Sequence, residues 1–262
     1  MLNKKTVWYK DKYAYISLGL CFAIAFLSFG YFIWEGDGVF TLMTDFRAQQ
    51  IPFSIGLNDA IKNANFGWQW NVDLGTNMIG AYSFYNLGSP FFWFSLLFPA
   101  EMFPYLVGWI YMLKYAVAGM TAYFYIGRFV EKKDCAVLGA VLCAFSGFQT
   151  VNLLFYHFHE VVAFFPLMLL GLEKLVVDRK KGLFAAAVFL NCLLNYYFFA
   201  GEVIFLIIYF ICRFGLKKES IVGIFQCCLE GVMGIGMAAF LFLPSVIFIQ
   251  GNPDAGSSLI RS

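Results

Sequence analysis

The stretch from Glu35 to Phe53 holds the residues whose types and spacing could do chemistry, and it follows directly on a long apolar run. Its candidates are two carboxylates, a guanidinium and two adjacent amides: Asp37, Asp45, Arg47, Gln49 and Gln50. A carboxylate fixed where water meets lipid, beside a cation, is what chemistry on a lipid-linked substrate requires. We interpret the stretch as a catalytic loop at a membrane surface. The alternative is a solvated loop whose acids have no role.

The composition indicates a membrane protein. The chain is 61% hydrophobic and only 13% charged, whereas a soluble domain has roughly 25% charged residues. The net charge of +2 gives no indication of a nucleic-acid partner. All seven cysteines lie in apolar runs, so they are expected to be small buried side chains rather than a disulfide framework.

Apolar runs predict an all-α integral membrane protein with about seven transmembrane helices in one module, residues 1–262. The predicted spans are Tyr13–Trp34, Met102–Ile126, Cys135–Phe155, Val161–Val177, Gly182–Phe198, Val203–Phe214 and Ser220–Ile249. The first can cross the hydrocarbon layer of about 30 Å, and no small-residue cleavage site follows it. The sixth span is short and is expected to include Phe199–Glu202 in order to reach the surface. Pro244 is expected to bend the seventh span.

The segment Glu35–Ser89 is predicted to be a long first extracytoplasmic loop with short interfacial helices. From Phe53 onward, apolar residues fall on one helical face and polar residues, including Asn58, on the other. This pattern indicates a short helix that lies on the membrane surface or packs against the bundle. The apolar run Phe91–Phe98 is too short to cross the membrane and is expected to dip in and return.

The distribution of basic residues predicts the orientation. Most of them fall on the N-terminal side of the membrane: Lys4, Lys5, Lys10, Lys12, Arg128, Lys132, Lys133, Lys174, Arg179, Lys180, Lys181, Arg213, Lys217 and Lys218. The other side has only Arg47, Lys62 and Arg261. The positive-inside rule therefore places the N-terminus in the cytoplasm and Glu35–Ser89 outside. This orientation excludes a G-protein-coupled receptor, and the absence of a lysine from the last span excludes a retinal protein.

Both histidines, His157 and His159, lie in one short outer turn beside Glu160. With a carboxylate from Glu35–Phe53 they could form a divalent metal site. Alternatively, they only hydrogen-bond lipid headgroups. No HExxH, CxxC, Walker A or GxGxxG element is present, so soluble-enzyme chemistries have no support.

Two charges fall inside predicted spans, Lys114 in the second and Glu230 in the seventh. Such charges are costly in a membrane and usually face the bundle interior or a water-filled cavity. They could pair with each other, or Lys114 could point into a substrate cavity. A proton or ion pathway is the rival interpretation, although the chain shows no internal repeat of the kind common in transporters.

Three sequence patterns resemble the bacterial YfhO family of membrane proteins. They are the run Met43–Phe53 with Thr-Asp-Phe-Arg at its start, the Gly- and Tyr-rich run Leu74–Phe91 ending in Ser-Pro-Phe, and Lys114–Gly119 in the second span. The family is similar to GT-C glycosyltransferases. The resemblance implies transfer of a sugar from a polyprenyl-phosphate donor to a cell-wall polymer such as lipoteichoic acid, on the outer face of the bacterial cell membrane. It also implies that this chain is the N-terminal portion of a longer family protein.

The resemblance assigns the general base to Asp45, with Asp37 second. The residues expected to bind the donor and its phosphate are Arg47, Gln49, Lys114, His157, His159, Glu160 and Arg261. Two other functions stay open: a transporter or flippase for a lipid-linked or polar solute, and a non-catalytic membrane assembly partner.

Overall fold

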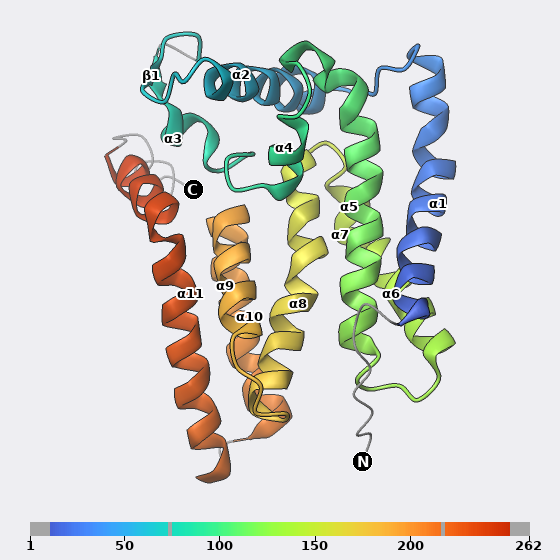
Figure 1. Ribbon diagram of the computed structural model, residues 1–262, viewed down its shortest axis with the longest axis vertical. Coiled ribbons are helices and arrows are strands. Elements are labelled where there is room, and N and C mark those ends of the chain that lie inside the picture. Colours follow the sequence, from blue (N-terminus) through green and yellow to red (C-terminus); the bar gives the residue numbers. More distant parts are fainter. Residues whose placement is uncertain (1–10, 73–74, 216–217, 252–262) are drawn as a thin grey trace, which may run out of the picture.

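The computed structural model describes residues 11–72, 75–215 and 218–251. Long helices run side by side, and a layer of short elements covers one end of them (Figure 1). In chain order the elements are α1 (Lys12–Glu35), η2 (Phe46–Gln50), α2 (Ile51–Lys62), β1 (Trp68–Gln69), β2 (Thr76–Asn77), α3 (Met78–Tyr82), α4 (Pro90–Ser95), η3 (Ala100–Met102), α5 (Phe103–Ile126), α6 (Lys133–Ala144), α7 (Gly147–Val151), η4 (Tyr156–Phe158), α8 (His159–Val176), α9 (Leu183–Leu194), α10 (Tyr196–Phe214) and α11 (Lys218–Gln250).

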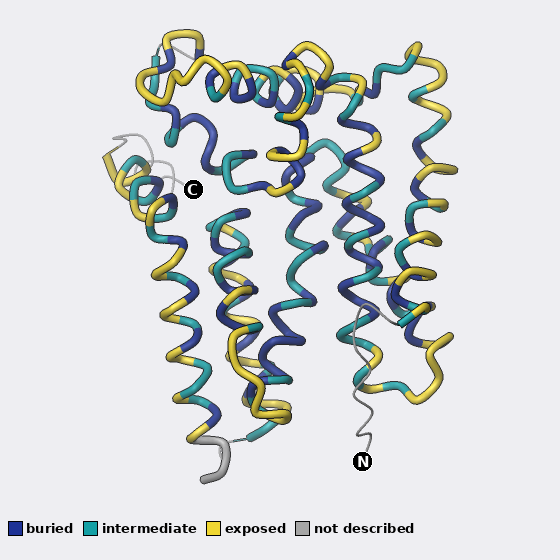
Figure 2. The backbone as a smooth tube through the Cα atoms, in the orientation of Figure 1, coloured by how far each residue is buried: buried dark blue, intermediate teal, exposed yellow. Residues whose placement is uncertain are grey.

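Among the described residues, four helical segments are long and apolar enough to cross a membrane: Lys12–Glu35, Lys133–Val151, Tyr196–Phe214 and Val222–Gln250. All four leave large apolar side chains exposed on their outer faces (Figure 2). The helices α5 and α8 lie at the centre instead, and α5 carries the fully buried Lys114. The predicted count of seven spans stays a prediction.

Helix α1 begins where Asp11 caps it, because the Asp11 carboxylate accepts a hydrogen bond from the backbone N–H of Tyr13. The other carboxylate oxygen accepts hydrogen bonds from the Tyr123 hydroxyl and from Lys133. One acidic residue therefore ties the start of α1 to the end of α5 and the start of α6.

Three predicted spans, the third, fifth and sixth, have different boundaries in the structure. The third is interrupted at Phe145 and Ser146, so that α6 ends and the short α7 follows. The predicted junction between the fifth and sixth spans lay after Phe198, but α9 ends at Leu194 and Asn195 starts α10. The Asn195 side chain accepts hydrogen bonds from the N–H groups of Tyr197 and Phe198, which makes it the N-cap of α10.

The layer over one end of the bundle is built around α2, which lies across the long helices (Figure 1). Of the two positions predicted for this helix, the structure shows packing against the rest of the chain, because Leu57 is buried among Val72, Met78, Tyr82 and others. Asn58, predicted to lie on the polar face of this helix, is buried. Its side chain is 1% exposed and donates to the carbonyls of Ser95 and Phe98, beside α4.

A small antiparallel pair, β1 and β2, closes the loop beyond α2, with Trp68 opposite Asn77 and Gln69 opposite Thr76. The basic connections α5–α6 and α8–α9 lie at the other end of the molecule, beside the start of α1 (Figure 1). This arrangement gathers the basic loops at one end, as the orientation argument requires. The cytoplasmic position of that end stays a prediction.

Candidate functional site

Asp45 lies in a segment with unusual backbone geometry. It directly precedes η2, a π-helical turn in which the N–H of Ile51 bonds the carbonyl of Phe46, five residues back. Pro52 accounts for the widened turn, since it has no N–H to give to the carbonyl of residue 48, and its ring would clash there in an α-helix. Thr44, just before Asp45, has φ of +53°, which is rare for a β-branched residue. Such turns and strained residues cluster at functional sites.

Two buried side chains, those of Phe46 and Gln50, anchor the same turn to the interior. Phe46 is completely buried, and its ring packs edge-on against Phe40, Tyr111 and Tyr156. Gln50 is 1% exposed. The side chains between and before these anchors point outward, so that Asp45 and Arg47 are both exposed, and Asp45 makes no capping hydrogen bond. A fixed backbone thus presents a free carboxylate and a guanidinium two residues apart.

Beneath the turn, the bundle contains a buried ion pair. Lys114 Nζ lies 2.7 Å from Glu160 Oε1, and the side chains are 0% and 2% exposed. Lys114 also donates to the carbonyl of Tyr156 and lies over its ring. Glu160 accepts a hydrogen bond of 2.6 Å from the hydroxyl of Ser89, which belongs to the layer over the end of the bundle. Because both charges are paired and hydrogen-bonded, their burial is tolerated.

The two histidines also lie inside, and they have different partners. His157 Nδ1 is 2.9 Å from Gln50 Oε1 in the π-helical turn. His159 Nε2 is 2.7 Å from the Tyr111 hydroxyl and 3.1 Å from the Asn152 carbonyl oxygen. Burial, with a further contribution from the Lys114 ammonium, lowers the pKa of His157 well below its usual range, so this ring is neutral.

The metal site that the sequence left open is not assembled in the described residues. No three His, Cys, Asp or Glu side chains gather in a metal-binding arrangement within residues 11–72, 75–215 and 218–251. The histidines instead bind amide, hydroxyl and carbonyl groups.

The residues predicted to bind the donor differ in exposure in the structure. Arg47 is exposed, and Gln49 is partly exposed and donates to the Tyr85 hydroxyl over 3.0 Å. The other four described candidates face the interior: Lys114, His157, His159 and Glu160. Arg261 lies outside the described residues.

Of the alternatives left open for Lys114, pairing with Glu230 is wrong, because Lys114 pairs with Glu160. Glu230 instead accepts hydrogen bonds from the backbone N–H groups of Gly182 and Ala185 at the start of α9. A carboxylate at a helix N-terminus satisfies free N–H groups and interacts favourably with the helix dipole.

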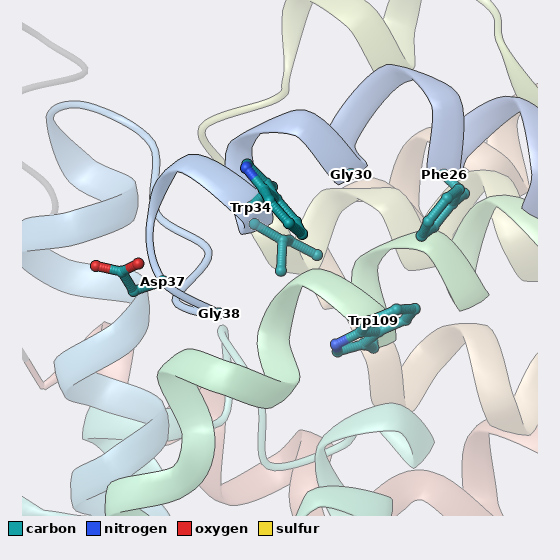
Figure 3. A pocket seen from close by; sticks show the side chains of 7 residues that line it. Phe26, Gly30, Trp34, Asp37, Gly38 and Trp109 are labelled. Atoms are coloured by element: carbon teal, nitrogen blue, oxygen red, sulfur yellow. The ribbon is translucent and has the colours of Figure 1, made fainter.

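Asp37, the second acid, lies at the outer end of an apolar groove between α1 and α5 (Figure 3). The groove has a volume of about 570 Å³ and is lined by Phe26, Gly30, Ile33, Trp34, Gly38 and Trp109 as well as Asp37. Figure 3 shows the Asp37 carboxylate turned away from the aromatic rings. Asp37 itself has φ of +52° and is exposed.

Sequence reasoning missed the uncharged members of this network: Ser89, Tyr111 and Tyr156. Ser89 begins the Ser-Pro-Phe run and carried one signal, since Ser before Pro is a frequent helix N-cap, and its hydroxyl does accept from the Phe92 N–H. Tyr111 precedes Lys114 by three residues, one helical turn, but nothing in its type distinguishes it from the many other tyrosines of this chain.

Four helical segments long and apolar enough to cross a membrane, with large apolar side chains exposed along them, indicate a multi-pass helical membrane protein. Residues 17–259 match the family model described as bacterial membrane protein YfhO. The chain therefore belongs to the YfhO family of bacterial membrane proteins. The comparisons found no matching curated protein and no matching solved structure.

Proposed function

We propose that this protein is a GT-C-like glycosyltransferase that moves a sugar from a polyprenyl-phosphate donor to a cell-wall polymer such as lipoteichoic acid. The observation that carries the proposal is Asp45. Its carboxylate is exposed, while its backbone is held between the strained Thr44 and the π-helical turn anchored by Phe46. A general base needs this combination, because it must reach a substrate proton from a fixed position.

The reaction joins an acceptor hydroxyl to the anomeric carbon of the donor sugar. Asp45 accepts the proton of that hydroxyl as the new C–O bond forms, and the bond from the anomeric carbon to the phosphate oxygen breaks. Negative charge then collects on the departing polyprenyl phosphate. Arg47, exposed on the same turn, stabilises that charge, and Gln49 is placed to assist it.

The location of the turn agrees with this chemistry. The layer that holds it covers one end of the bundle, and the basic loops lie at the other end (Figure 1). The positive-inside rule makes the layer extracytoplasmic, where donor and polymer would meet. In the proposal the polyprenyl chain stays in the bilayer beside the bundle. Asp37, at the end of the apolar groove, is the second candidate base.

Cysteine labelling tests the orientation. Asn63 and Asn71 are both exposed in the outer layer, so Asn63→Cys and Asn71→Cys should react with a membrane-impermeant maleimide added to intact cells. The unsubstituted protein supplies the background from its own cysteines. Reaction only after lysis would reverse the orientation and remove the proposed outer-face reaction.

The functional test is Asp45→Asn in the full-length gene product. The change keeps the shape of the side chain but removes the proton acceptor, so incorporation of labelled sugar from a polyprenyl-phosphate donor should fall by about 10²–10⁴-fold. Asp59→Asn is the matched control, since Asp59 is another exposed acid in the same layer. Asp37→Asn tests the second candidate. Full transfer by Asp45→Asn at normal expression would rule out Asp45 as the base.

A further inference from the structure

We infer that His157 is a positioning residue: acting through Gln50, it holds the π-helical turn that presents Asp45. The inference rests on the proposed function for its effect on catalysis. The link between His157 and the turn is a separate claim about the structure, and it is tested by itself below.

The first step is that the turn needs an internal anchor at its C-terminal end. Its π-type hydrogen bond replaces the ordinary α-helical one, and Pro52 removes a further donor. Gln50 closes the turn, and its backbone carbonyl accepts from the Ser54 hydroxyl, which in turn accepts from Asn86. Phe46 anchors the start of the turn by apolar packing, and the side chain of Gln50 is the polar group through which the bundle can hold its C-terminal end.

The second step is that His157 is the bundle residue that binds this side chain. The neutral ring donates from Nδ1 to Gln50 Oε1 over 2.9 Å, and the Gln50 amide nitrogen is then free to face Gln49 Oε1 at 3.4 Å. Gln49 donates in its turn to the Tyr85 hydroxyl. The bond from His157 to Gln50 therefore links the bundle to the turn, and the two further bonds connect the turn to Tyr85.

The third step is that His157 is itself held rigidly. Its ring lies edge-on to Phe84, Tyr85 and Phe158, with centroids 5.2, 5.0 and 4.4 Å away. A fixed ring that is bonded to a buried amide keeps the turn in one position relative to the bundle. This matters for catalysis because small displacements of a reacting group have large effects on the rate.

His157 does not touch substrate in this arrangement, since it is 2% exposed. It differs from Asp45 in that its removal should lower kcat without removing the base. It also differs from an ordinary buried residue, because the decrease in kcat should depend on whether the hydrogen bond to Gln50 is present rather than on the overall stability of the fold.

The test compares His157→Phe, which keeps a ring but removes the donor, with His157→Asn, which keeps a donor near the Nδ1 position. In His157→Phe, we expect amide hydrogen exchange in residues 46–51 to become faster. We also expect kcat for sugar transfer to fall by up to about 100-fold, with KM for the donor nearly unchanged. His157→Asn should restore most of both. In a Gln50→Leu background, His157→Phe should have little further effect, because both changes remove the same bond.

Thr121→Val is the matched control for stability alone. Thr121 is also buried, and its hydroxyl donates to the carbonyl of Ala163 between α5 and α8, about two helical turns beyond Lys114 along α5 and without a bond to the turn. This variant should lower the melting temperature without changing exchange at residues 46–51 or kcat.

The inference and the proposed function fail in different ways. Unchanged exchange at residues 46–51 in His157→Phe overturns the inferred link, whatever the activity. Faster exchange with unchanged kcat, while Asp45→Asn is inactive, overturns the positioning role but leaves Asp45 as the base. If Asp45→Asn is fully active, the proposed base is wrong, and the exchange measurement still decides whether His157 holds the turn.

Discussion

Two pairs of charged side chains lie toward the covered end of the molecule, and they differ in exposure: one pair is exposed and the other is buried. Asp45 and Arg47 are exposed on a single turn, and no ion pair in the described ranges includes either. Lys114 and Glu160 are buried and bonded to each other, to Ser89 and to the Tyr156 carbonyl. The exposed pair is free to meet a substrate, whereas the buried pair joins the layer that holds Ser89 to the bundle.

The largest expected effect on stability comes from breaking the buried pair. Lys114→Met leaves the Glu160 carboxylate buried without its counter-charge, so the free energy of unfolding should fall by about 3–5 kcal/mol. Denaturant unfolding in detergent measures the change. The double variant Lys114→Met/Glu160→Leu should recover much of the loss, because no unpaired charge remains. A single variant as stable as the native protein would show that the pair is not the connection described.

Arg47→Ala tests the exposed pair. We expect transfer to fall by about 10–100-fold, since one cationic donor to the leaving phosphate is lost. The free energy of unfolding should change by less than about 0.5 kcal/mol, because the side chain is exposed. Steady-state kinetics with labelled donor, and melting temperature on the same samples, give both values. Arg47→Lys should keep part of the activity; activity equal to native in Arg47→Ala would remove Arg47 from the site.

The sequence predicted some of this arrangement and missed the rest for identifiable reasons. The apolar run of α1 and the face of α2 follow from periodicity, and a lysine in an apolar run required a polar partner. That partner could not be chosen from the sequence, since Glu160 and Glu230 were equally available and only packing brings α8 beside α5. The widened turn at Phe46 had no signal beyond Pro52. The N-cap at Asn195 had the usual residue type, but it lay inside a continuous apolar run.

Glu230→Gln separates a capping residue from an ion pathway. As the cap of α9, Glu230 should contribute about 1–2 kcal/mol to the free energy of unfolding, and Gln should retain part of this because its oxygen still accepts. Sugar transfer per folded molecule should not change. A large loss of function with normal folding would contradict the capping role and favour transport.

The smallest effect is expected at the opposite end of the molecule. Hydrogen bonds from the Arg128 guanidinium hold the pKa of Asp178 below its usual range. A carboxyl whose pKa is lowered by folding stabilises the protein above its unfolded pKa, and this stability is lost as the pH falls through the folded value. Since the pair is partly exposed, Asp178→Asn should cost no more than about 1 kcal/mol at neutral pH. The difference from the native protein should disappear in acid, which unfolding curves at neutral and acidic pH would show.

The most direct test of the different roles of the two pairs is one comparison of sugar transfer per folded molecule. Asp45→Asn and the double variant Lys114→Met/Glu160→Leu are measured side by side in the full-length protein, with folded protein quantified by size-exclusion chromatography. We predict that Asp45→Asn loses at least about 100-fold, while the double variant retains most of its transfer. The contrary result, full transfer by Asp45→Asn and loss only in the double variant, would show that the buried pair carries the function and would favour transport over glycosyl transfer.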